Sequence, residues 1–321
     1  MKKIGILFGQ ENSFPPAFVE RVNQKTGGKD ISAEFVRIDK VIQGEPSGYD
    51  VIVDRISQDV PFYRGFLKNA ALTGTAVINN PFWWSADEKF FNNALATKIG
   101  VAVPRTVLLP SHQTPPDTNA GSFRNLAYPM DWEGIFSYVG WPAYFKPFAG
   151  GGWKNVYKLN NPDEFFRAYS ETGQLVMMLQ EEVIFDMYFR CYSIDQRKVK
   201  VMNYEPRHPY DQRYQTDWSA PKAILEKVEW GVQQLNEYLG YDLNTVEFAI
   251  RDGVPLAIDF CNPAPDAEVT SVGQENFDWV VDAVSDMAIR KAKEHKPGQD
   301  NLSWGKFIRA GTTGRSLSQL A

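Results

Sequence analysis

The chain has 321 residues, of which 43% are hydrophobic and 23% charged, and its formal net charge at pH 7 is −5. This length allows two domains or one large composite domain, and the ordinary balance of residues excludes disorder, collagen-like repeats and coiled coil for the whole chain. The slightly acidic balance gives no basic footprint for nucleic acid.

The cysteines and the apolar segments of the chain exclude several classes of protein. The two cysteines, Cys191 and Cys261, build neither a disulfide framework nor a cysteine-rich zinc site. No apolar segment approaches the ~18 residues of a membrane-spanning helix. The short apolar start at residues 1–9 indicates a first strand and not a signal peptide. We expect a cytoplasmic enzyme or binding protein, alone or as a homodimer, that binds small molecules and neither nucleic acid nor membrane.

The first hundred residues alternate short apolar strands with helices. We expect strands at 3–8, 33–38, 49–54 and 75–79, with helices at 16–23 and 63–72. This alternation predicts a parallel sheet covered by helices. A capping box, Ser85-Ala86-Asp87-Glu88, then starts a helix that stops before Gly100, and a strand at 106–109 follows. Residues 1–109 are predicted to form an N-terminal α/β domain.

The middle of the chain is predicted to mix helices and strands. A polar loop rich in Pro, Ser and Thr fills 110–122. A helix at 132–139, strands at 143–146 and 155–159, a helix capped by Asn161 with Pro162 in its first turn, and a strand at 176–181 follow. Residues 110–183 are predicted to be a central α+β subdomain.

The last part is predicted to be a second α+β subdomain, residues 184–321. It begins with a strand pair at 188–194 and 198–204, a polar loop at 205–217 and a helix at 221–239. Strands at 244–251 and 254–260 flank Asp252-Gly253, which is a strong hairpin signal. A helix at 276–293 and a Gly/Ser-rich tail complete the chain.

A lysine at a strand end precedes three glycines, in the order Lys146, Gly150, Gly151, Gly152 and then Trp153. Glycines let backbone amides approach an anion closely, and a lysine supplies a point charge to a phosphate. The pattern indicates a phosphate-covering loop in a β-hairpin. The alternative is an ordinary glycine turn with an exposed lysine, because short motifs are weak signals.

The segment Gln180-Glu181-Glu182-Val183 follows a buried strand. Its position suits a hinge whose backbone meets an adenine edge while a glutamate meets the ribose. The alternative is a strand end with two solvated glutamates, because charged residues are mostly exposed.

The hairpin near the end of the chain carries Glu247, Asp259 and Asn262, whose oxygens suit Mg²⁺. A two-residue loop would pair Arg251 with Val254 and put the two carboxylates on opposite faces. A three-residue loop with a bulge would put both carboxylates on one face, which a metal site requires. An acid in the apolar segment around Asp259 favours a functional role, since an unpaired charge there is costly.

Further basic and polar residues are candidates for anion or substrate binding. Arg190 lies within an apolar strand, where an arginine needs a carboxylate or phosphate partner. The polar loop holds Arg207, His208 and Tyr210. Arg55 follows the third strand, and open α/β sheets bind ligands beyond such strand ends. Each basic residue taken alone is more often a solvated charge.

The conjunction of motifs carries more information than each alone. In chain order they are Asn79-Asn80-Pro81, Asp87-Glu88-Lys89, Gly100, Pro104, Lys146-Pro147 with the glycine loop, Gln180-Glu181-Glu182-Val183, Arg190, and Glu247, Asp259 and Asn262-Pro263. This order resembles the ATP-grasp superfamily over most of residues 75–265. It is similar to the branch of glutathione synthetases, D-alanine–D-alanine ligases and ribosomal-protein glutamate ligases. The resemblance implies a parallel α/β domain followed by two α+β subdomains that enclose a nucleotide cleft.

The resemblance also implies roles for most of the candidate residues. The residues that would bind ATP are Lys89, Lys146, Gly150, Gly151, Gly152, Trp153, Glu181, Glu182, Val183 and Asp186. The residues that would hold Mg²⁺ are Glu247, Asp259 and Asn262. Those that would act in catalysis are Arg190, Arg207 and Lys146. The candidates for substrate binding come instead from the polar loop and from the position of Arg55 after a strand, and they are Arg55, Arg207, His208 and Tyr210.

The chain departs from the family pattern around the metal site. The family usually has its asparagine two residues after the metal acid, whereas Cys261 is inserted here and Asn262 follows Asp259 by three. Aspartate replaces the commoner glutamate at 259, and glutamate replaces the commoner aspartate at 247. Tyr188 stands where an acid is often found, two residues before the arginine.

The implied activity is ATP- and Mg²⁺-dependent ligation of a carboxylate to an amine through an acyl phosphate. The altered metal motif motivates one alternative, an ATP-binding regulatory protein without ligase activity, and a kinase on the same fold is another. A 14% content of aromatic residues motivates a further alternative, a carbohydrate- or peptide-binding surface. On the ligase interpretation, Phe148 and Trp153 are the aromatic residues expected to touch the nucleotide.

Overall fold

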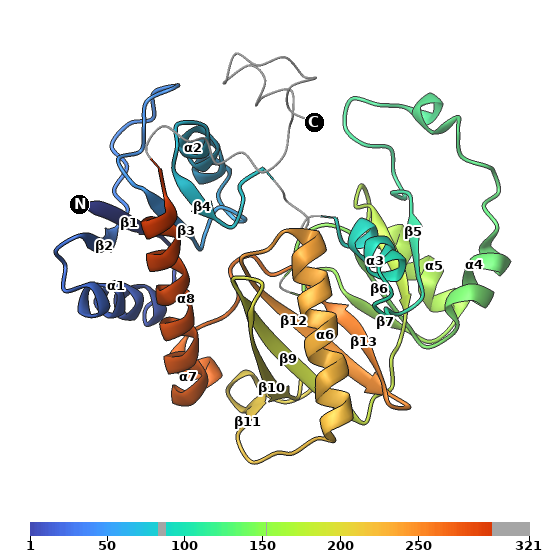
Figure 1. Cartoon of the computed structure of the whole chain (residues 1–321). Helices are drawn as coiled ribbons and strands as arrows, with labels where there is room; N and C mark the ends of the chain where they lie inside the picture. Colours follow the sequence, from blue (N-terminus) through green and yellow to red (C-terminus); the bar gives the residue numbers. More distant parts are fainter. Residues whose placement is uncertain (83–87, 152, 297–321) are drawn as a thin grey trace, which may run out of the picture.

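The computed structural model describes residues 1–82, 88–151 and 153–296. Its strands form three sheets, one parallel and two antiparallel (Figure 1). The predicted class, an N-terminal parallel α/β part followed by two α+β parts, is confirmed. The boundaries at 109 and 183 stay predictions.

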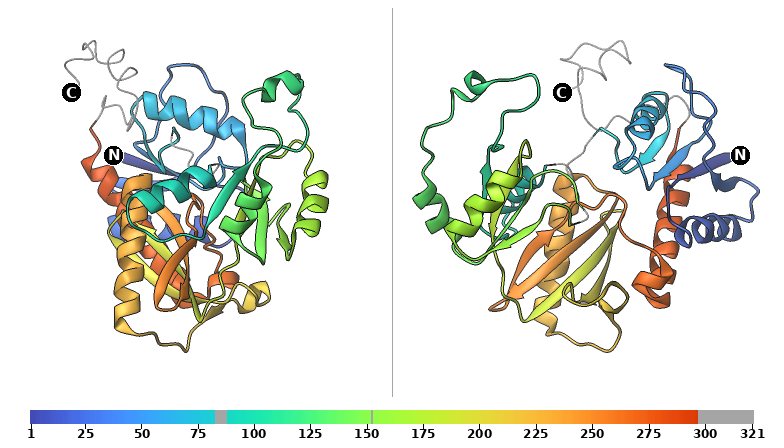
Figure 2. Two further views of the ribbon diagram at one scale, coloured as in Figure 1. Left: turned by 90° about the vertical axis from the view of Figure 1, so that its right-hand side faces the viewer. Right: turned by 180° about the vertical axis from the view of Figure 1, so that it is seen from behind.

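The first sheet has the strand order β2-β1-β3-β4, and every neighbouring pair is parallel. Its strands are β1 (Lys2–Leu7), β2 (Ile31–Phe35), β3 (Val51–Asp54) and β4 (Ala76–Ile78). Helices α1 (Phe14–Thr26) and α2 (Pro61–Leu72) connect them. Helix α8 (Gln274–Glu294) packs on α1 and β1 and completes this core, as Figures 1 and 2 show. The first sheet therefore depends on a helix from the end of the described chain.

The second sheet has the order β5-β8-β6-β7 and is antiparallel. Its strands are β5 (Thr106–Leu109), β6 (Ala143–Pro147), β7 (Tyr157–Leu159) and β8 (Met177–Glu181). Helices α4 (Trp132–Val139) and α5 (Pro162–Glu171) pack on it with a cluster of aromatic rings. Strand β7 begins later than expected because Trp153 and Asn155 both have positive φ, which prolongs the turn.

The third sheet has the order β11-β10-β9-β12-β13 and is antiparallel. Its strands are β9 (Met187–Ile194), β10 (Lys198–Tyr204), β11 (Tyr214–Gln215), β12 (Leu243–Arg251) and β13 (Val254–Asp259). Helix α6 (Lys222–Leu239) covers one face (Figure 1). Gly231 on α6 lies against the Phe248 ring, and a Cβ there would approach the ring to 2.7 Å. The close contact explains a glycine in the middle of this helix.

Helix α3 (Lys89–Lys98) joins the second and third sheets, since it contacts β5 and buries Ala96 in the α6 core. Gly100 has a φ of 85°, as expected for the residue that ends this helix. Most of the predicted capping box, at 85–87, lies outside the described residues, and Glu88 is the N-cap without a side-chain hydrogen bond. The predicted tail from 297 also lies outside them.

Four short elements were not expected from the sequence. They are the 3-10 helices η2 (Ala120–Phe123) and η3 (Tyr210–Gln212), strand β11 and helix α7 (Val269–Val272). Segments this short hold no complete period of a hydrophobic pattern. No helix in the described ranges is long and apolar enough to cross a membrane.

Candidate functional site

The turn of the β12–β13 hairpin has two residues. Asp252 and Gly253 have φ of 52° and 72°, and Arg251 pairs with Val254 across them. Two successive residues with positive φ are typical of the type I′ turn, whose twist matches that of the strands. The register with the two-residue loop is therefore the one that forms.

The hairpin nevertheless has a bulge, which lies farther from the turn than the expected three-residue register placed it. The register shifts between Glu247 and Phe248, so that Glu247 pairs directly with Asp259 and Ile258 is the extra residue. An extra residue reverses the side on which the following residue lies. The two carboxylates therefore share a face although the loop has only two residues.

Two lysines from other elements lie beside this carboxylate pair. Lys89 is the first residue of α3, and its backbone N–H donates to the carbonyl of Phe148 at 3.0 Å, just before the glycine loop. The ammonium of Lys146, at the end of β6, donates to Oε1 of Gln180 at 2.8 Å. The Gln180 amide in turn donates to the hydroxyl of Thr106 at 2.8 Å. The buried Gln180 thus holds the Lys146 side chain in place.

The charges of this cluster shift one another's pKa values. Burial and the nearby Lys89 lower the pKa of Lys146 to about 8, against the opposing effect of both carboxylates. Burial disfavours the charged form of Asp259, but Lys89, Lys146 and Arg190 hold its pKa below the ordinary value. Burial raises the pKa of Glu247, which Arg190 only partly offsets. The site therefore combines a carboxylate with a lowered pKa, a second carboxylate with a raised pKa, and three basic groups.

Arg190 and Tyr188, both on β9, hold Glu247 from the other side. The Tyr188 hydroxyl donates to Oε2 of Glu247 at 2.6 Å. Nε of Arg190 lies 3.7 Å from Oε1 of the same carboxylate. Burial raises the pKa of Tyr188 well above its ordinary value, so the phenol stays a donor. Sequence reasoning missed this role, although the place of Tyr188 two residues before Arg190 was a signal.

The oxygen atoms of Glu247, Asp259 and Asn262 fit a magnesium ion. The Asn262 amide donates to the carbonyl of Thr245 at 3.2 Å, which ties it to β12. No hydrogen bond to its Oδ1 atom occurs within the described part of the chain. Within residues 1–82, 88–151 and 153–296, no three His, Cys, Asp or Glu side chains are grouped so that they could hold a metal. Mg²⁺ is commonly held by one or two carboxylates plus phosphates, and this site offers two carboxylates and an amide oxygen.

Comparison with known proteins identifies the fold. No protein-family model and no curated protein matches the chain. Solved structures do: a D-alanine–D-alanine ligase from Bacillus anthracis, complexed with ATP, matches 92% of this chain and 98% of its own, with a TM-score of 0.63 and 13% identity. The chain has the ATP-grasp fold.

Two further ATP-grasp structures agree. A RimK domain protein from Sphaerobacter thermophilus covers 89% of this chain and 99% of its own, with a TM-score of 0.64 and 12% identity. The ATP-grasp ligase PsnB, complexed with a minimal precursor, Mg and ADP, covers 90% of this chain and 98% of its own, with a TM-score of 0.59 and 16% identity. The predicted family resemblance is confirmed at the level of the fold.

The predicted hinge of the ATP-grasp fold is tied to both antiparallel sheets. The buried Glu181 carboxylate accepts from Nε of Arg105 at 2.9 Å and lies 3.4 Å from Nη2 of Arg251. Glu182 pairs with Lys158 at 2.6 Å. Both glutamate side chains therefore have protein partners, and ribose binding by a glutamate stays a prediction.

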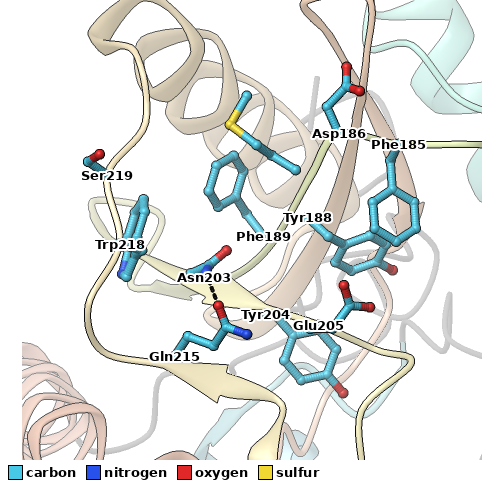
Figure 3. A pocket seen from close by; sticks show the side chains of 11 residues that line it. Phe185, Asp186, Tyr188, Phe189, Asn203, Tyr204, Glu205, Gln215, Trp218 and Ser219 are labelled. Carbon is cyan, nitrogen blue, oxygen red and sulfur yellow. Dashed lines mark hydrogen bonds between the residues drawn. The ribbon is translucent and has the colours of Figure 1, made fainter.

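The last predicted nucleotide residues of the ATP-grasp pattern lie between the hinge and β9. Val183 packs with Tyr188 and Tyr204, and Asp186 is exposed. Asp186 lines a cavity of about 220 Å³ between the start of β9 and the end of β10, where Tyr188 and Tyr204 lie side by side (Figure 3). The Tyr188 phenol thus separates this cavity from Glu247.

The glycine loop joins β6 to β7, which confirms the predicted hairpin. Gly150 has a φ of 84°, a conformation that favours glycine, and Gly152 lies outside the described residues. Trp153 is 68% exposed and Phe148 is half-buried. Their contact with a nucleotide stays a prediction.

The polar loop places its candidates apart from the carboxylate cluster. Arg207 binds the Glu205 carboxylate with two donors, and its side chain is 69% exposed and lies 4.5 Å above the Phe185 ring. His208 is exposed, and Tyr210 begins η3. Their roles in catalysis and substrate binding stay predictions.

Arg55 is buried in an ion pair with Glu11. Its guanidinium donates to both Glu11 oxygens, one at 2.9 Å, and to the carbonyl of Pro265 at 2.6 Å, and it stacks 4.8 Å from the Phe14 ring. Substrate binding by Arg55 would require it to leave this pair.

Proposed function

We propose that this protein is an ATP- and Mg²⁺-dependent ligase that joins a carboxylate to an amine. The observation that carries the proposal is the bulged β12–β13 hairpin, which sets Glu247 opposite Asp259 beside Lys89, Lys146 and Arg190. Two carboxylates and an amide oxygen next to two lysines suit the phosphates of magnesium-bound ATP. The ATP-grasp ligases named above, which share this fold, support the same reaction class.

The reaction has two steps in which atoms balance. An oxygen of the substrate carboxylate attacks the γ-phosphorus of ATP, the bond to the β,γ-bridging oxygen breaks, and ADP leaves. The amine then attacks the acyl carbon of the acyl phosphate, inorganic phosphate leaves, and the amine gives up a proton. Both steps require positioning and charge neutralisation more than covalent chemistry by the protein.

Each residue of the cluster has a part in that scheme. Lys89 and Lys146 neutralise phosphate charge, and Gln180 keeps Lys146 oriented. Arg190 stabilises the negative charge of the transferred phosphoryl group. Glu247, Asp259 and Asn262 would hold Mg²⁺, which supplies charge neutralisation on the phosphate oxygens when bound. The loop at 150–152 would cover the phosphates and exclude water from the acyl phosphate.

The test measures ADP release from ATP with magnesium in the presence of a panel of amino acids and dipeptides. We expect ADP, phosphate and a ligated product with at least one pair of substrates. Asp259→Asn should abolish turnover and weaken MgATP binding by calorimetry, whereas Asp163→Asn, at an exposed carboxylate on α5, should change neither. The absence of ADP release together with unchanged nucleotide binding by Asp259→Asn would refute the proposal. MgATP binding without turnover would indicate a regulatory protein, and a phosphorylated product without phosphate release would indicate a kinase.

A further inference from the structure

Three buried polar groups on the third sheet have no hydrogen-bond partner among the described residues, and two of them are considered together because they share a face, whereas the third, Oγ of Ser193, does not lie on that face. The two are Nε of Arg190 on β9 and the hydroxyl of Tyr214 on β11. Nearly all buried polar groups in folded proteins are hydrogen-bonded, and a free one needs an explanation such as a ligand or an ordered water. The Arg190 guanidinium is weakly engaged, since Nε has only a long ion pair with Glu247 at 3.7 Å and Nη2 donates to the Thr245 hydroxyl at 3.5 Å.

Strand register puts both groups on the same face of the sheet. Arg190 pairs with Met202 on β10, and Tyr204, two residues later on that strand, pairs with Tyr214. Residues two apart on a strand lie on the same face. The Tyr204 ring lies 5.5 Å from the Arg190 guanidinium and 5.0 Å from the Tyr214 ring. The Tyr204 ring therefore lies between Arg190 and the Tyr214 ring.

The polar groups on this face have two ends. The phosphate end is Asp259 with the two lysines beside it, and the second end is Tyr214. The pKa of Asp259, on β13, responds to Lys89 and Lys146. Apart from the effect of burial, the pKa of Tyr214 responds to Arg190, Tyr192 and Asp266. Arg190 lies between, next to Glu247 on one side and Tyr214 on the other. Tyr214 is thus on the side of Arg190 away from the phosphate-binding lysines.

The second end faces the N-terminal part of the molecule. Tyr214 packs against the core that contains α8 and the first sheet. The neighbouring Tyr192 hydroxyl donates to the carbonyl of Asp266, in the segment whose Pro265 carbonyl accepts from Arg55. A group bound between Arg190 and Tyr214 would therefore lie where the third sheet meets the first, beyond the phosphates.

We propose that Tyr214 is a substrate-binding residue, and that its phenol and the Arg190 guanidinium together hold the carboxylate that the ligase activates. The inference rests on the proposed function. A carboxylate offers up to four acceptor positions on two oxygens, so one oxygen accepts from the phenol and the other from the guanidinium. Hydrogen bonds from a charged donor to a carboxylate are about twice as strong as neutral ones, which suits a residue that orients the attacking oxygen.

The test uses acetate as a minimal carboxylate and inorganic phosphate as the competing anion. Tyrosines are labelled as 3-fluorotyrosine, and the Tyr214 resonance is assigned from its loss in Tyr214→Phe. With MgADP present, acetate should shift this resonance in a saturable way. Arg190→Gln should weaken acetate binding, followed by this resonance, about tenfold or more, the effect of one lost hydrogen bond to a charged group. Tyr214→Phe lacks the resonance, and calorimetry should show acetate binding weakened to a similar extent. Tyr238→Phe, at an exposed tyrosine of α6, should have no effect.

Stability provides a second readout that does not depend on a ligand. Because the Tyr214 hydroxyl has no partner among the described residues, Tyr214→Phe should leave the free protein as stable as the wild type or more so. A marked loss of stability, a Tyr214 resonance that acetate leaves unmoved, or one that phosphate alone moves would overturn the inference. If the wild type fails to bind MgADP, the proposed function itself fails. If it binds MgADP while Tyr214 does not respond to acetate, only this inference fails.

Discussion

Two arginines, Arg55 at the end of β3 and Arg190 in β9, are both withdrawn from solvent but have different surroundings. Arg55 makes paired bonds to Glu11, a bond to a backbone carbonyl and a contact with the Phe14 ring. Nε of Arg190 lies 3.7 Å from the Glu247 carboxylate and has no hydrogen bond among the described residues, and Nη2 lies 3.5 Å from the Thr245 hydroxyl.

The difference lies in how far the donors of each arginine are satisfied by the protein itself. An arginine with saturated donors stabilises the fold, because removing it leaves a buried carboxylate unpaired. An arginine with free donors beside carboxylates and phenols is prepared to receive an anion. The contrast predicts that variants at Arg55 change stability first, whereas variants at Arg190 change activity first.

The largest expected effect is that of Arg190→Gln on turnover. Loss of one preorganised donor to a developing negative charge lowers kcat about 10²- to 10³-fold in other enzymes. We expect a loss of this size, measured as ADP release with the substrates found for the wild type. The loss of stability should be smaller than that of Arg55→Met. An Arg190→Gln protein with normal turnover would break the comparison.

Arg55→Met should lower the free energy of unfolding by about 2–4 kcal/mol, because it leaves Glu11 without its partner. The value is below that of a fully buried pair because the Glu11 side chain is 19% exposed. Chemical denaturation measures it, and the double variant Arg55→Met with Glu11→Gln should recover part of the loss. A raised KM for the carboxylate with unchanged stability would instead assign Arg55 to substrate binding.

Tyr188→Phe should weaken magnesium-dependent nucleotide binding about tenfold, as loss of a group that orients a metal ligand does elsewhere. It removes only the hydroxyl that donates to Glu247 at 2.6 Å. Titration of magnesium at fixed ADP measures the effect. Tyr238→Phe serves as the exposed control. Equal magnesium affinity in both variants would show that the hydrogen bond does not position Glu247.

The smallest expected effect is a severalfold decrease in MgADP affinity as the pH rises above about 8, the pKa of Lys146 in the free protein. A neutral amine attracts phosphate less, although bound phosphates themselves raise this pKa and limit the decrease. Calorimetry of wild type and Lys146→Arg should show the decrease only in the wild type. Between about pH 8 and pH 10.5, Lys146 is protonated in the unfolded chain but largely neutral in the folded protein. The free energy of unfolding of the ligand-free protein should therefore increase as the pH rises through this range.

The extent to which sequence could predict the site differs from residue to residue. The local pattern predicted Lys146 at the end of a strand and Lys89 in a helix that it started earlier, at Ser85, and the structure places both lysines beside Asp259. The hairpin carboxylates were also predicted, but with two open registers. The position of Ile258 as the extra residue depends on pairing with β12 along its whole length, which no local signal reveals.

The roles of Tyr214 and of the Glu11–Arg55 pair could not be predicted from the neighbouring sequence. Tyr214 stands on a two-residue strand inside a polar segment, and Glu11 lies far from Arg55 in sequence. In both cases the partner is chosen by long-range packing, and a tyrosine or an arginine is equally compatible with a solvated surface. Isolated polar residues of this kind show their function only when their neighbours are known.

The sequence by itself determined the fold class, the order of elements and which residues are candidates for phosphate binding, because periodicity, turn residues and motif spacing are local properties of the chain. Only the tertiary structure decided that Glu247 faces Asp259, that Arg55 is saturated, and that Arg190 and Tyr214 each keep, on one face, a polar atom without a hydrogen bond to the described residues. The physical reason is that register, burial and the satisfaction of donors depend on contacts between segments distant in the chain.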